Sequence, residues 1–227
     1  MRAVILAAGR GERMRPLTDN VPKPLVRMPF DSAQGKPLID YTFAALPDSV
    51  TEVILVVGYR GEQIKKYCGT RFAGRDILYV EQKEPRGTFH ALKLAAAYLD
   101  NEFLVMLSDD IYAKQDIEKL STRQNAILVK QIESGSERFG HCIEKDGLLC
   151  GLVEKQPGIP RPLACCGPFK LTKKIFNEPV IYGSSGEEVL SPMVGAMSKR
   201  VPVNVVHASF WHPIATPEDL ALGAEGL

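Results

Sequence analysis

The densest group of residues able to do chemistry lies in a loop near the start of the chain, between Gly9 and Leu25. Gly9 and Gly11 follow a short apolar run, where glycines let the backbone approach a ligand closely and direct N–H groups at phosphate oxygens. Basic side chains crowd the same loop, namely Arg10, Arg13, Arg15 and Lys23. Positioned cations are the main means by which proteins meet the charge that develops in phosphoryl-type transfer. The loop therefore predicts a site for a polyanionic phosphate.

The overall charge shows how local this site is. The chain has 28 basic and 27 acidic residues among 227, for a formal net charge of +1, yet residues 1–27 contain six basic groups against two acidic ones. A near-neutral total argues against a nucleic-acid or membrane-surface partner, which usually requires a large basic excess. No apolar run approaches the ~18 residues that span a bilayer. Five cysteines without a Cys-x-x-Cys pair indicate reduced thiols. We expect a soluble, cytoplasmic protein.

Two familiar phosphate loops do not match the residues after Gly9. The dinucleotide fingerprint requires a third glycine where Met14 stands, and the helix that should follow would be interrupted by Pro16. A Walker A loop requires a Gly-Lys-Ser or Gly-Lys-Thr triplet, which this loop lacks. These departures argue against a Rossmann oxidoreductase, which remains the alternative from another class of protein.

The elements that must position this loop can be predicted from hydrophobic periodicity. Residues 3–8, 53–57 and 103–107 are continuous apolar runs, as in strands that are buried on both faces. Stretches with helical spacing lie between them, at residues 38–46, 61–68 and 88–99. This alternation predicts an α/β fold with a mostly parallel central sheet flanked by helices. Ligands of such sheets bind at the carboxyl ends of the strands.

The second half of the chain has a different pattern. After residues 126–129, which continue the sheet, short strand candidates at 139–142, 148–154 and 163–171 are separated by glycine and proline turns. Helical spacing returns only at 187–197 and 217–222. No linker-like stretch divides the halves. We expect a single domain over residues 1–227, with a small substrate-facing β region in its second half.

The first loop as a whole resembles the signature of a known family. Leu6-Ala7-Ala8-Gly9-x-Gly11-x-Arg13-Met14-x-Pro16-Leu17-Thr18, followed by Pro22-Lys23-Pro24, is similar to the sugar-1-phosphate nucleotidylyltransferases, which make nucleotide sugars from a nucleoside triphosphate and a sugar 1-phosphate. The resemblance implies a Rossmann-like, glycosyltransferase-A-like fold, with a nucleotide-binding half (1–130) and a sugar-phosphate-binding half (131–227). It implies catalytic roles for Arg13 and Lys23, which would hold the triphosphate and the attacking phosphate. The nucleotide-binding residues that it implies are Leu6, Ala8, Gly9, Gly11, Glu12, Arg13, Gln82 and Gly87.

The base-reading segment of the family resembles Val80-Glu81-Gln82-x-x-Pro85-x-Gly87-Thr88. A glutamine amide offers a donor and an acceptor side by side, which suits the imide edge of uracil or thymine. By this resemblance, the Gln82 side chain and the Gly87 backbone would read the base. Taken alone, a glutamine in this position is more often a solvated loop residue, and Gly87-Thr88 is also consistent with a helix N-terminus and its cap.

Two adjacent carboxylates follow the third apolar run. Leu107-Ser108-Asp109-Asp110 looks like the family's metal site, which implies that Asp109 binds Mg²⁺ and acts in catalysis. Neighbouring carboxylates at the end of a buried strand are costly unless a cation or hydrogen bonds compensate them. We assign Asp110 instead to capping the turn that leads into a helical segment near Asp116.

The second half of the chain resembles the family's sugar-binding region, but it departs from the family's motifs at more positions. Gly140 matches a glycine that lies against the sugar, while Glu154 and Lys155 match a Glu-Lys-Pro motif into which Gln156 intrudes. The resemblance assigns Glu154 to sugar hydroxyls and Lys155 to the sugar phosphate, although the register also allows Gln156 in the place of the lysine. Cys165 stands where the family commonly has an asparagine that binds a hydroxyl, and a thiol is a poor substitute.

The last motif of the family shows the sharpest departure. In Trp211-His212-Pro213-Ile214-Ala215-Thr216-Pro217, proline occupies the place of a second metal-binding aspartate. One carboxylate with substrate phosphates and water can hold Mg²⁺, so we expect an active enzyme. His212 is interpreted as a structural histidine in preference to a substitute ligand. A noncatalytic or weakened relative that binds a nucleotide sugar or a partner subunit remains the alternative, and a homo-oligomer is possible.

Overall fold

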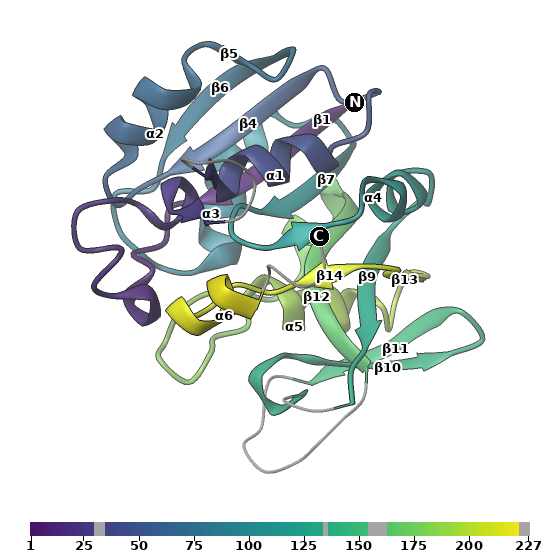
Figure 1. The fold of residues 1–227 in the computed structure, drawn as a ribbon. Helices are drawn as coiled ribbons and strands as arrows, with labels where there is room; N and C mark the ends of the chain where they lie inside the picture. Colours follow the sequence, from purple (N-terminus) through teal and green to yellow (C-terminus); the bar gives the residue numbers. More distant parts are fainter. Residues whose placement is uncertain (30–34, 134–135, 154–162, 223–227) are drawn as a thin grey trace.

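Most of the chain is organised around one large sheet (Figure 1). The computed structural model describes residues 1–29, 35–133, 136–153 and 163–222. Ten strands of this part of the chain form the sheet, in the order β10-β11-β13-β9-β12-β7-β1-β4-β6-β5. Along the chain their bounds are β1 Arg2–Ala7, β4 Glu52–Val57, β5 Arg71–Phe72, β6 Arg75–Glu81, β7 Glu102–Leu107, β9 Ala126–Gln131, β10 His141–Lys145, β11 Leu148–Val153, β12 Leu163–Thr172 and β13 Asn204–His207.

The first half of the sheet is parallel. Strand β1 lies between β4 and β7, with Ala3 opposite Val53 on one side and Leu104 on the other, and β4 pairs in turn with β6. All three of these residues are fully buried. Near-continuous burial is what an apolar strand needs when helices cover both faces of a sheet. The three apolar runs of the sequence therefore end side by side at one edge.

The second half of the sheet differs from the expectation, because most of its pairs are antiparallel. Strand β12 runs antiparallel to both β7 and β9, and β10 and β11 form a hairpin; β13 and β9 are a parallel pair. Antiparallel neighbours need only short connections, whereas parallel strands require a crossover. The Asp146-Gly147 turn between β10 and β11 is such a short connection. The α/β fold with flanking helices is confirmed, with this mixed second half.

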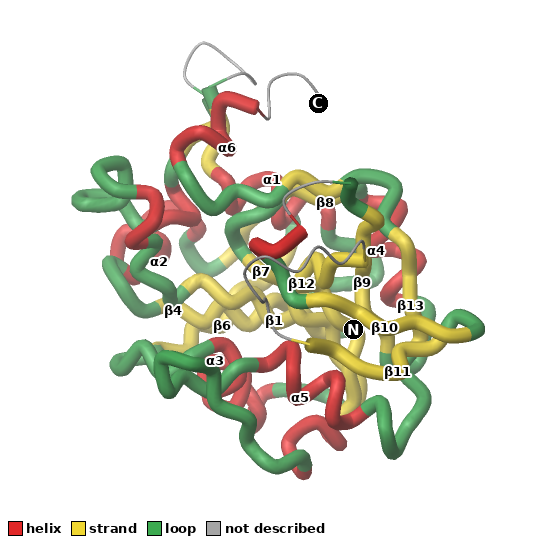
Figure 2. The backbone as a smooth tube through the Cα atoms, turned by 90° about the horizontal axis from the view of Figure 1, so that it is seen from below, coloured by secondary structure: helices red, strands yellow, loops and turns green. Residues whose placement is uncertain are grey.

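Helices cover both faces of the sheet (Figure 2). Helices α1, α2 and α4 pack one face, where Phe43 and Ile64 meet the buried side chain of Ile5. Helices α3 and α5 pack the other, where Phe89 and Met193 belong to the same cluster as Val4 and Ile54 of the strands. The helices are α1 Leu38–Ala45, α2 Gly61–Cys68, α3 Thr88–Ala95, α4 Lys114–Ser121, α5 Leu190–Met197 and α6 Pro217–Leu222.

Short elements complete the fold around the site. Two-stranded pairs are formed by β2 (Arg27–Met28) with β3 (Lys36–Pro37) and by β8 (Ile111–Tyr112) with β14 (Trp211–His212). The 3₁₀ helices are η1 Glu12–Met14, η2 Lys23–Leu25, η3 Ala96–Tyr98, η4 Ser136–Arg138 and η5 Lys173–Asn177. Within the described residues, no helix has the length and apolarity required to cross a membrane.

Strands β5, β6 and β13 of the large sheet are absent from the sequence-based expectation. Residues of β6 alternate between half-buried and exposed positions along much of the strand, and charged Arg75 and Asp76 open it. Its apolar run, Ile77-Leu78-Tyr79-Val80, is shorter than the runs by which the other three strands of the first half are found. The helix expected over residues 88–99 is α3 followed by η3, and the one expected over 187–197 begins only at Leu190.

Candidate active site

A cavity of about 770 Å³ opens at the carboxyl ends of the parallel strands. The end of β1, the loop after it, the segment after β6 and the end of β7 all contribute to its wall. All of the residues predicted to bind the nucleotide line it, together with Lys23 and Asp109; they are Leu6, Ala8, Gly9, Gly11, Glu12, Arg13, Gln82 and Gly87. Arg10 lines the cavity as well, whereas Arg15 does not and pairs instead with Asp19.

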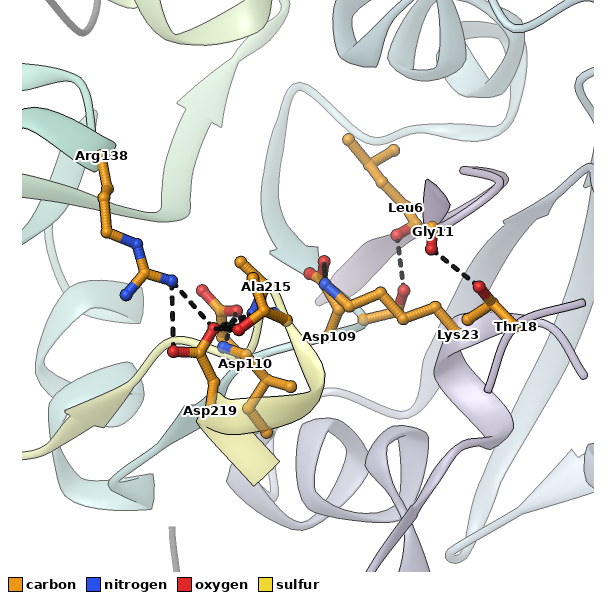
Figure 3. Close-up of polar contacts among 12 residues, drawn as sticks. Leu6, Gly11, Thr18, Lys23, Asp109, Asp110, Arg138, Ala215 and Asp219 are labelled. Atoms are coloured by element: carbon orange, nitrogen blue, oxygen red, sulfur yellow. Dashed lines mark hydrogen bonds and ion pairs between the residues drawn. The ribbon is translucent and has the colours of Figure 1, made fainter. Parts of the chain in front are cut away.

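The glycine loop is folded back on itself by contacts that require a glycine. Gly11 has a φ of 64°, and its carbonyl accepts hydrogen bonds from the Met14 N–H and from the Thr18 hydroxyl, the latter at 2.8 Å (Figure 3). A Cβ at position 11 would lie 2.9 Å from Cβ of Lys23. A side chain there is excluded both by the left-handed backbone and by this contact. The loop therefore brings Lys23 against the end of β1.

Lys23 and Asp109 meet at the centre of the cavity wall. The Lys23 ammonium lies 2.5 Å from Oδ2 of Asp109, although the two residues are 86 positions apart in the chain (Figure 3). The lysine side chain is 9% exposed and the aspartate side chain 31% exposed. The neighbouring Ser108 hydroxyl donates to the Leu6 carbonyl at 2.9 Å, which fixes the end of β7 against the end of β1. The site thus combines a mostly buried cation with a carboxylate that reaches the cavity.

Asp110 has a structural role that differs from the predicted cap. Its carboxylate accepts a hydrogen bond from Trp211 Nε1 at 3.0 Å and another from the Ile214 N–H at 3.1 Å. Helix α4 has Ala113 as its N-cap residue and no side-chain cap, so the assignment of Asp110 to a cap is wrong. Burial and the charge of Asp109 raise the pKa of Asp110 to about 7, against the opposing effect of Lys23 and these hydrogen bonds.

Three aspartates, of which Asp116 and Asp219 are buried, hold the segment 209–219, which we call the C-terminal clasp. Asp110 binds it as described; Oδ2 of Asp116 accepts from the Ser209 N–H at 2.6 Å; and Asp219 accepts from the backbone N–H groups of Ala215 and Thr216, both at 2.8 Å. Arg138 donates to both carboxylate oxygens of Asp219 (Figure 3). The clasp places Ala215 in the wall of the cavity.

His212 and Pro213 both lie in the clasp. His212 Nε2 is 2.8 Å from the carbonyl oxygen of Asp219. Neither His212 nor Pro213 lines the cavity. This contact agrees with the interpretation of His212 as a structural histidine. Pro213 directly precedes Ile214, whose N–H binds Asp110, so residue 213 lies close to the pair of aspartates.

The base-reading segment is built around Gln82 and Gly87. Gln82 is 7% exposed, and its Nε2 lies 3.1 Å from the Gly87 carbonyl oxygen and 2.9 Å from Nδ1 of His90. Gly87 has a φ of 102°, and a Cβ there would lie 2.3 Å from the Glu188 carbonyl oxygen. Helix α3 begins at Thr88 with Gly87 as its N-cap residue, so the helix N-terminus expected here is present. It has no side-chain cap, because the Thr88 hydroxyl accepts the Leu190 N–H instead.

The predicted sugar-side residues are placed differently. Gly140 and Cys165 are neighbours, because the Cys165 N–H donates to the Gly140 carbonyl at 2.8 Å, yet neither lines the cavity. The Cys165 thiol is a hydrogen-bond partner of Cys142, and this bond together with burial raises the pKa of the Cys142 thiol. Glu154 and Lys155 lie outside the described residues, as does Gln156.

The donor set for a metal is small. No group of three or more histidine, cysteine, aspartate or glutamate side chains within the described ranges could hold a metal ion. Asp109 uses Oδ2 for Lys23, and none of the hydrogen bonds between described residues involves its Oδ1. A hard cation such as Mg²⁺ is commonly held by one or two carboxylates together with substrate phosphates and water. The residues present fit a cation of that kind and do not form a protein cage.

Sequence patterns missed three residues of the cavity wall. Glu187 and Val189 come from the segment before α5, and Ala215 comes from the clasp. The Phe89 N–H donates to the Glu188 carbonyl at 2.9 Å, which brings that segment against the start of α3. These contacts join residues about 100 positions apart, and no local pattern in the sequence signals them.

Comparisons with known proteins show the family to which the chain belongs. The profile of the family described as "Nucleotidyl transferase" matches residues 2–181. The chain is 34% identical to the UTP–glucose-1-phosphate uridylyltransferase AglF of Haloferax volcanii, over 96% of this chain and 93% of that protein. It is 32% identical to the bifunctional protein GlmU of Methanocaldococcus jannaschii, over 97% of this chain and 52% of that protein, so the chain spans about half the length of this relative.

The fold also matches a solved structure. The crystal structure of a UDP-glucose pyrophosphorylase in complex with UDP-glucose superposes with a TM-score of 0.83, at 20% identity, over 99% of this chain and 97% of that one. At this identity the likeness establishes the fold alone. The profile and the two relatives identify the family, and they exclude the alternative of a Rossmann oxidoreductase.

Proposed function

Because this chain belongs to the nucleotidyl transferase family, we propose that it transfers a nucleotidyl group from a nucleoside triphosphate to a sugar 1-phosphate. The products are a nucleotide sugar and pyrophosphate. The observation that carries the proposal is the convergence of Arg13, Lys23 and Asp109 on one cavity at the carboxyl edge of the sheet. The name of the Haloferax relative, a UTP–glucose-1-phosphate uridylyltransferase, describes a reaction of this class.

The reaction is an in-line displacement that needs no covalent intermediate with the protein. An oxygen of the sugar phosphate attacks the α-phosphorus, the new P–O bond forms, and the bond to the leaving pyrophosphate breaks. The physical demand is to hold two polyanions together and to neutralise their charge. In this proposal Lys23 orients the attacking phosphate, and Arg13 stabilises the pyrophosphate that leaves. The low exposure of the Lys23 side chain strengthens its effect, because charges interact more strongly away from bulk water.

We assign Asp109 to Mg²⁺, with its Oδ1 as the oxygen available for the ion. When bound, the ion neutralises phosphate charge. The Lys23 ammonium already shares Oδ2 of the same carboxylate. Asp109 therefore has two tasks, to orient Lys23 and to hold a cation beside it.

The remaining assignments divide the chain into two halves. The glycine loop, Gln82 and Gly87 serve the nucleotide within residues 1–130. Residues 131–227 serve the sugar phosphate, through Gly140, Glu154, Lys155 and Cys165. Within the described residues, support for the second set is limited to the contact between Gly140 and Cys165.

Release of pyrophosphate, measured with Mg²⁺ across a panel of nucleoside triphosphates and sugar 1-phosphates, tests the proposal. We expect turnover with at least one pair, and a fall in kcat/KM of about 100-fold in Arg13→Ala, the typical loss when one group that stabilises transition-state charge is removed. Arg15→Ala is the matched control, because Arg15 lies in the same loop but pairs with Asp19 outside the cavity.

Three outcomes are informative. Loss in Arg13→Ala with normal turnover in Arg15→Ala supports the enzyme. Equal losses in both variants contradict the assignment of Arg13. Thermal stabilisation by a nucleotide sugar, without turnover on any substrate pair, would contradict the enzyme hypothesis. It would support the alternative of a noncatalytic relative, which the departure at Pro213 favours.

A further inference from the structure

The amide of Gln82 presents only one of its two polar ends to the cavity. Its Nε2 carries two hydrogens, and two acceptors lie within hydrogen-bond distance, the Gly87 carbonyl oxygen at 3.1 Å and His90 Nδ1 at 2.9 Å. No donor from the described residues reaches Oε1. Gln82 is more than nine-tenths buried and lines the cavity. The free group that it offers to a ligand is therefore a hydrogen-bond acceptor.

The orientation of this amide follows from the chemistry of its partners. A backbone carbonyl can only accept a hydrogen bond, so the Gly87 oxygen must face Nε2 and not Oε1. An amide nitrogen can only donate, so Nδ1 of His90 must be the acceptor, and the ring proton belongs on Nε2 of the imidazole. Gly87 therefore fixes which way the amide points. His90 takes the second hydrogen, which would otherwise be free to meet a ligand.

His90 is held in this position by the first turn of α3, which is bound to the segment before α5. The Phe89 N–H donates to the Glu188 carbonyl at 2.9 Å, and Thr88 Oγ1 accepts the Leu190 N–H at 3.0 Å. The buried Glu188 carboxylate lies 2.5 Å from Lys93 Nζ on the next turn of α3. Contacts on both sides of residue 90 thus hold the helix start and keep the imidazole against Gln82.

We propose that His90 is a specificity-determining residue, which keeps Gln82 as an acceptor only and so selects nucleobases with a ring N–H on their pairing edge. This inference rests on the proposed function. Uracil and thymine have such an N–H at N3, and guanine has one at N1. Cytosine and adenine have a bare acceptor nitrogen at the same edge, which would face the Gln82 oxygen without a proton between them.

This replaces the expectation from sequence, in which the amide offers a donor and an acceptor side by side. Sites built to hydrogen-bond one group reject an analogue that lacks it, because a buried polar atom is then left unpaired. The same argument applies to Gln82 Oε1, which belongs to a largely buried residue of the cavity wall and has no protein donor within the described chain.

UTP and CTP are the sharpest pair of probes, since they differ only at N3 and C4 of the base. We expect the wild type to have a higher kcat/KM for UTP than for CTP with one sugar 1-phosphate. In His90→Leu the second amide hydrogen is released, and the UTP-to-CTP ratio should fall about tenfold, the factor associated with one hydrogen bond. His90→Gln supplies a new acceptor and should keep most of the ratio. Leu94→Ala, at an exposed position on the same helix, is the control.

Binding of UTP and CTP, measured by thermal stabilisation and by titration calorimetry, gives a second readout that needs no turnover. A wild type that prefers CTP, or a folded His90→Leu variant with an unchanged ratio, overturns the role of His90 and leaves nucleotidyl transfer standing. A wild type without turnover on any substrate pair overturns the proposed function, and the ratio of the two binding constants still decides on His90. If His90→Leu does not fold, the same two measurements are made on His90→Ala, which also removes the acceptor and should lower the UTP-to-CTP ratio relative to His90→Gln; equal ratios in these two variants overturn the role of His90.

Discussion

The two halves of the sheet position their functional residues in different ways. In the parallel half, strands β1 and β7 end side by side, and the residues that follow them meet in one cavity. In the antiparallel half, Gly140 and Cys165 contact each other but lie outside that cavity, and the residues that reach it are Glu187, Val189 and Ala215. Parallel strands bring all of their carboxyl ends to one edge, whereas antiparallel strands alternate between edges. The parallel arrangement alone thus brings the residues after β1 and β7 to one edge, whereas in the second half only specific contacts between distant segments bring residues to the cavity.

The contrast extends to the aspartates. Asp109 ends the parallel half, reaches the cavity and pairs with Lys23. Asp110, the next residue, is turned away and joins Asp116 and Asp219 in holding the C-terminal clasp. Residues 108–110 form a bend after the end of β7, and the two neighbouring carboxylates have different partners, so they serve two regions.

The largest effect that we expect would come from Asp109→Asn. The variant keeps an oxygen that can accept from Lys23 but loses the negative charge proposed to hold Mg²⁺. We expect kcat to fall about 100- to 1000-fold, while the free energy of unfolding changes by only about 1 kcal/mol. Steady-state kinetics across a Mg²⁺ titration and chemical denaturation measure the two quantities.

Asp19→Asn, at an exposed position that lies outside the cavity, should leave both quantities unchanged. Full Mg²⁺-dependent activity in Asp109→Asn would show that the metal assignment is wrong and that the parallel half does not contain the catalytic carboxylate.

An intermediate effect, on stability, is expected from Asp219→Asn in the clasp. Asp219 accepts hydrogen bonds from Arg138, Ala215 and Thr216, and asparagine has only one oxygen for these donors. We expect a loss of about 1–3 kcal/mol in the free energy of unfolding at pH 7. Urea denaturation measures it, and Glu218→Gln at the exposed neighbouring position is the matched control.

We also expect the difference in stability between the wild type and Asp219→Asn to depend on pH. Burial acts to raise the pKa of Asp219, but the hydrogen bonds from Arg138, Ala215 and Thr216 outweigh it and hold the pKa below the ordinary value of 3.8. A carboxylate with a lowered pKa in the folded state stabilises the protein fully above its unfolded-state value and loses this contribution as the pH falls through the folded-state value. The difference in stability between wild type and Asp219→Asn should be constant near neutral pH and should shrink below about pH 4. A difference that grows on acidification contradicts the assignment.

The smallest effect is expected from Pro213→Asp, which adds a carboxylate to the clasp near Asp109 and Asp110. We expect the Mg²⁺ concentration at half-maximal rate to fall by up to about tenfold, since each added carboxylate strengthens a site for a hard cation. We expect kcat to stay equal or to rise. Pro213→Asn, without the charge, separates this effect from the loss of proline. A lower rate at an unchanged Mg²⁺ requirement would mean that position 213 does not face the metal.

Sequence reasoning located much of the fold. The expected strands at 3–8, 53–57 and 103–107 agree with β1, β4 and β7 to within one residue at each end, and the helix expected at 61–68 is α2. These segments have strong periodicity, which depends only on local burial. Strand β6 was missed because its residues alternate in exposure, and the direction of β12 could not be inferred because pairing partners are not written in a local pattern.

The residues of the site likewise divide into those that the sequence predicted correctly and those that it did not. The glycine loop with its cations was singled out from residue types, and Asp109 through the resemblance to a known family; all of these segments line the cavity. The role of Asp110 was wrong, because its donors in Trp211 and Ile214 lie about 100 residues later.

By itself, the sequence determined the class of fold and the chemical character of the loop, since both follow from residue types and short spacings. The tertiary structure alone decided the ion pair between Lys23 and Asp109, the wall contributed by Glu187 and Ala215, and the acceptor that Gln82 presents. Each of these depends on which groups meet across long separations. Burial then makes every unpaired donor or acceptor costly, so the pairing found in the fold sets the chemistry that a side chain can perform.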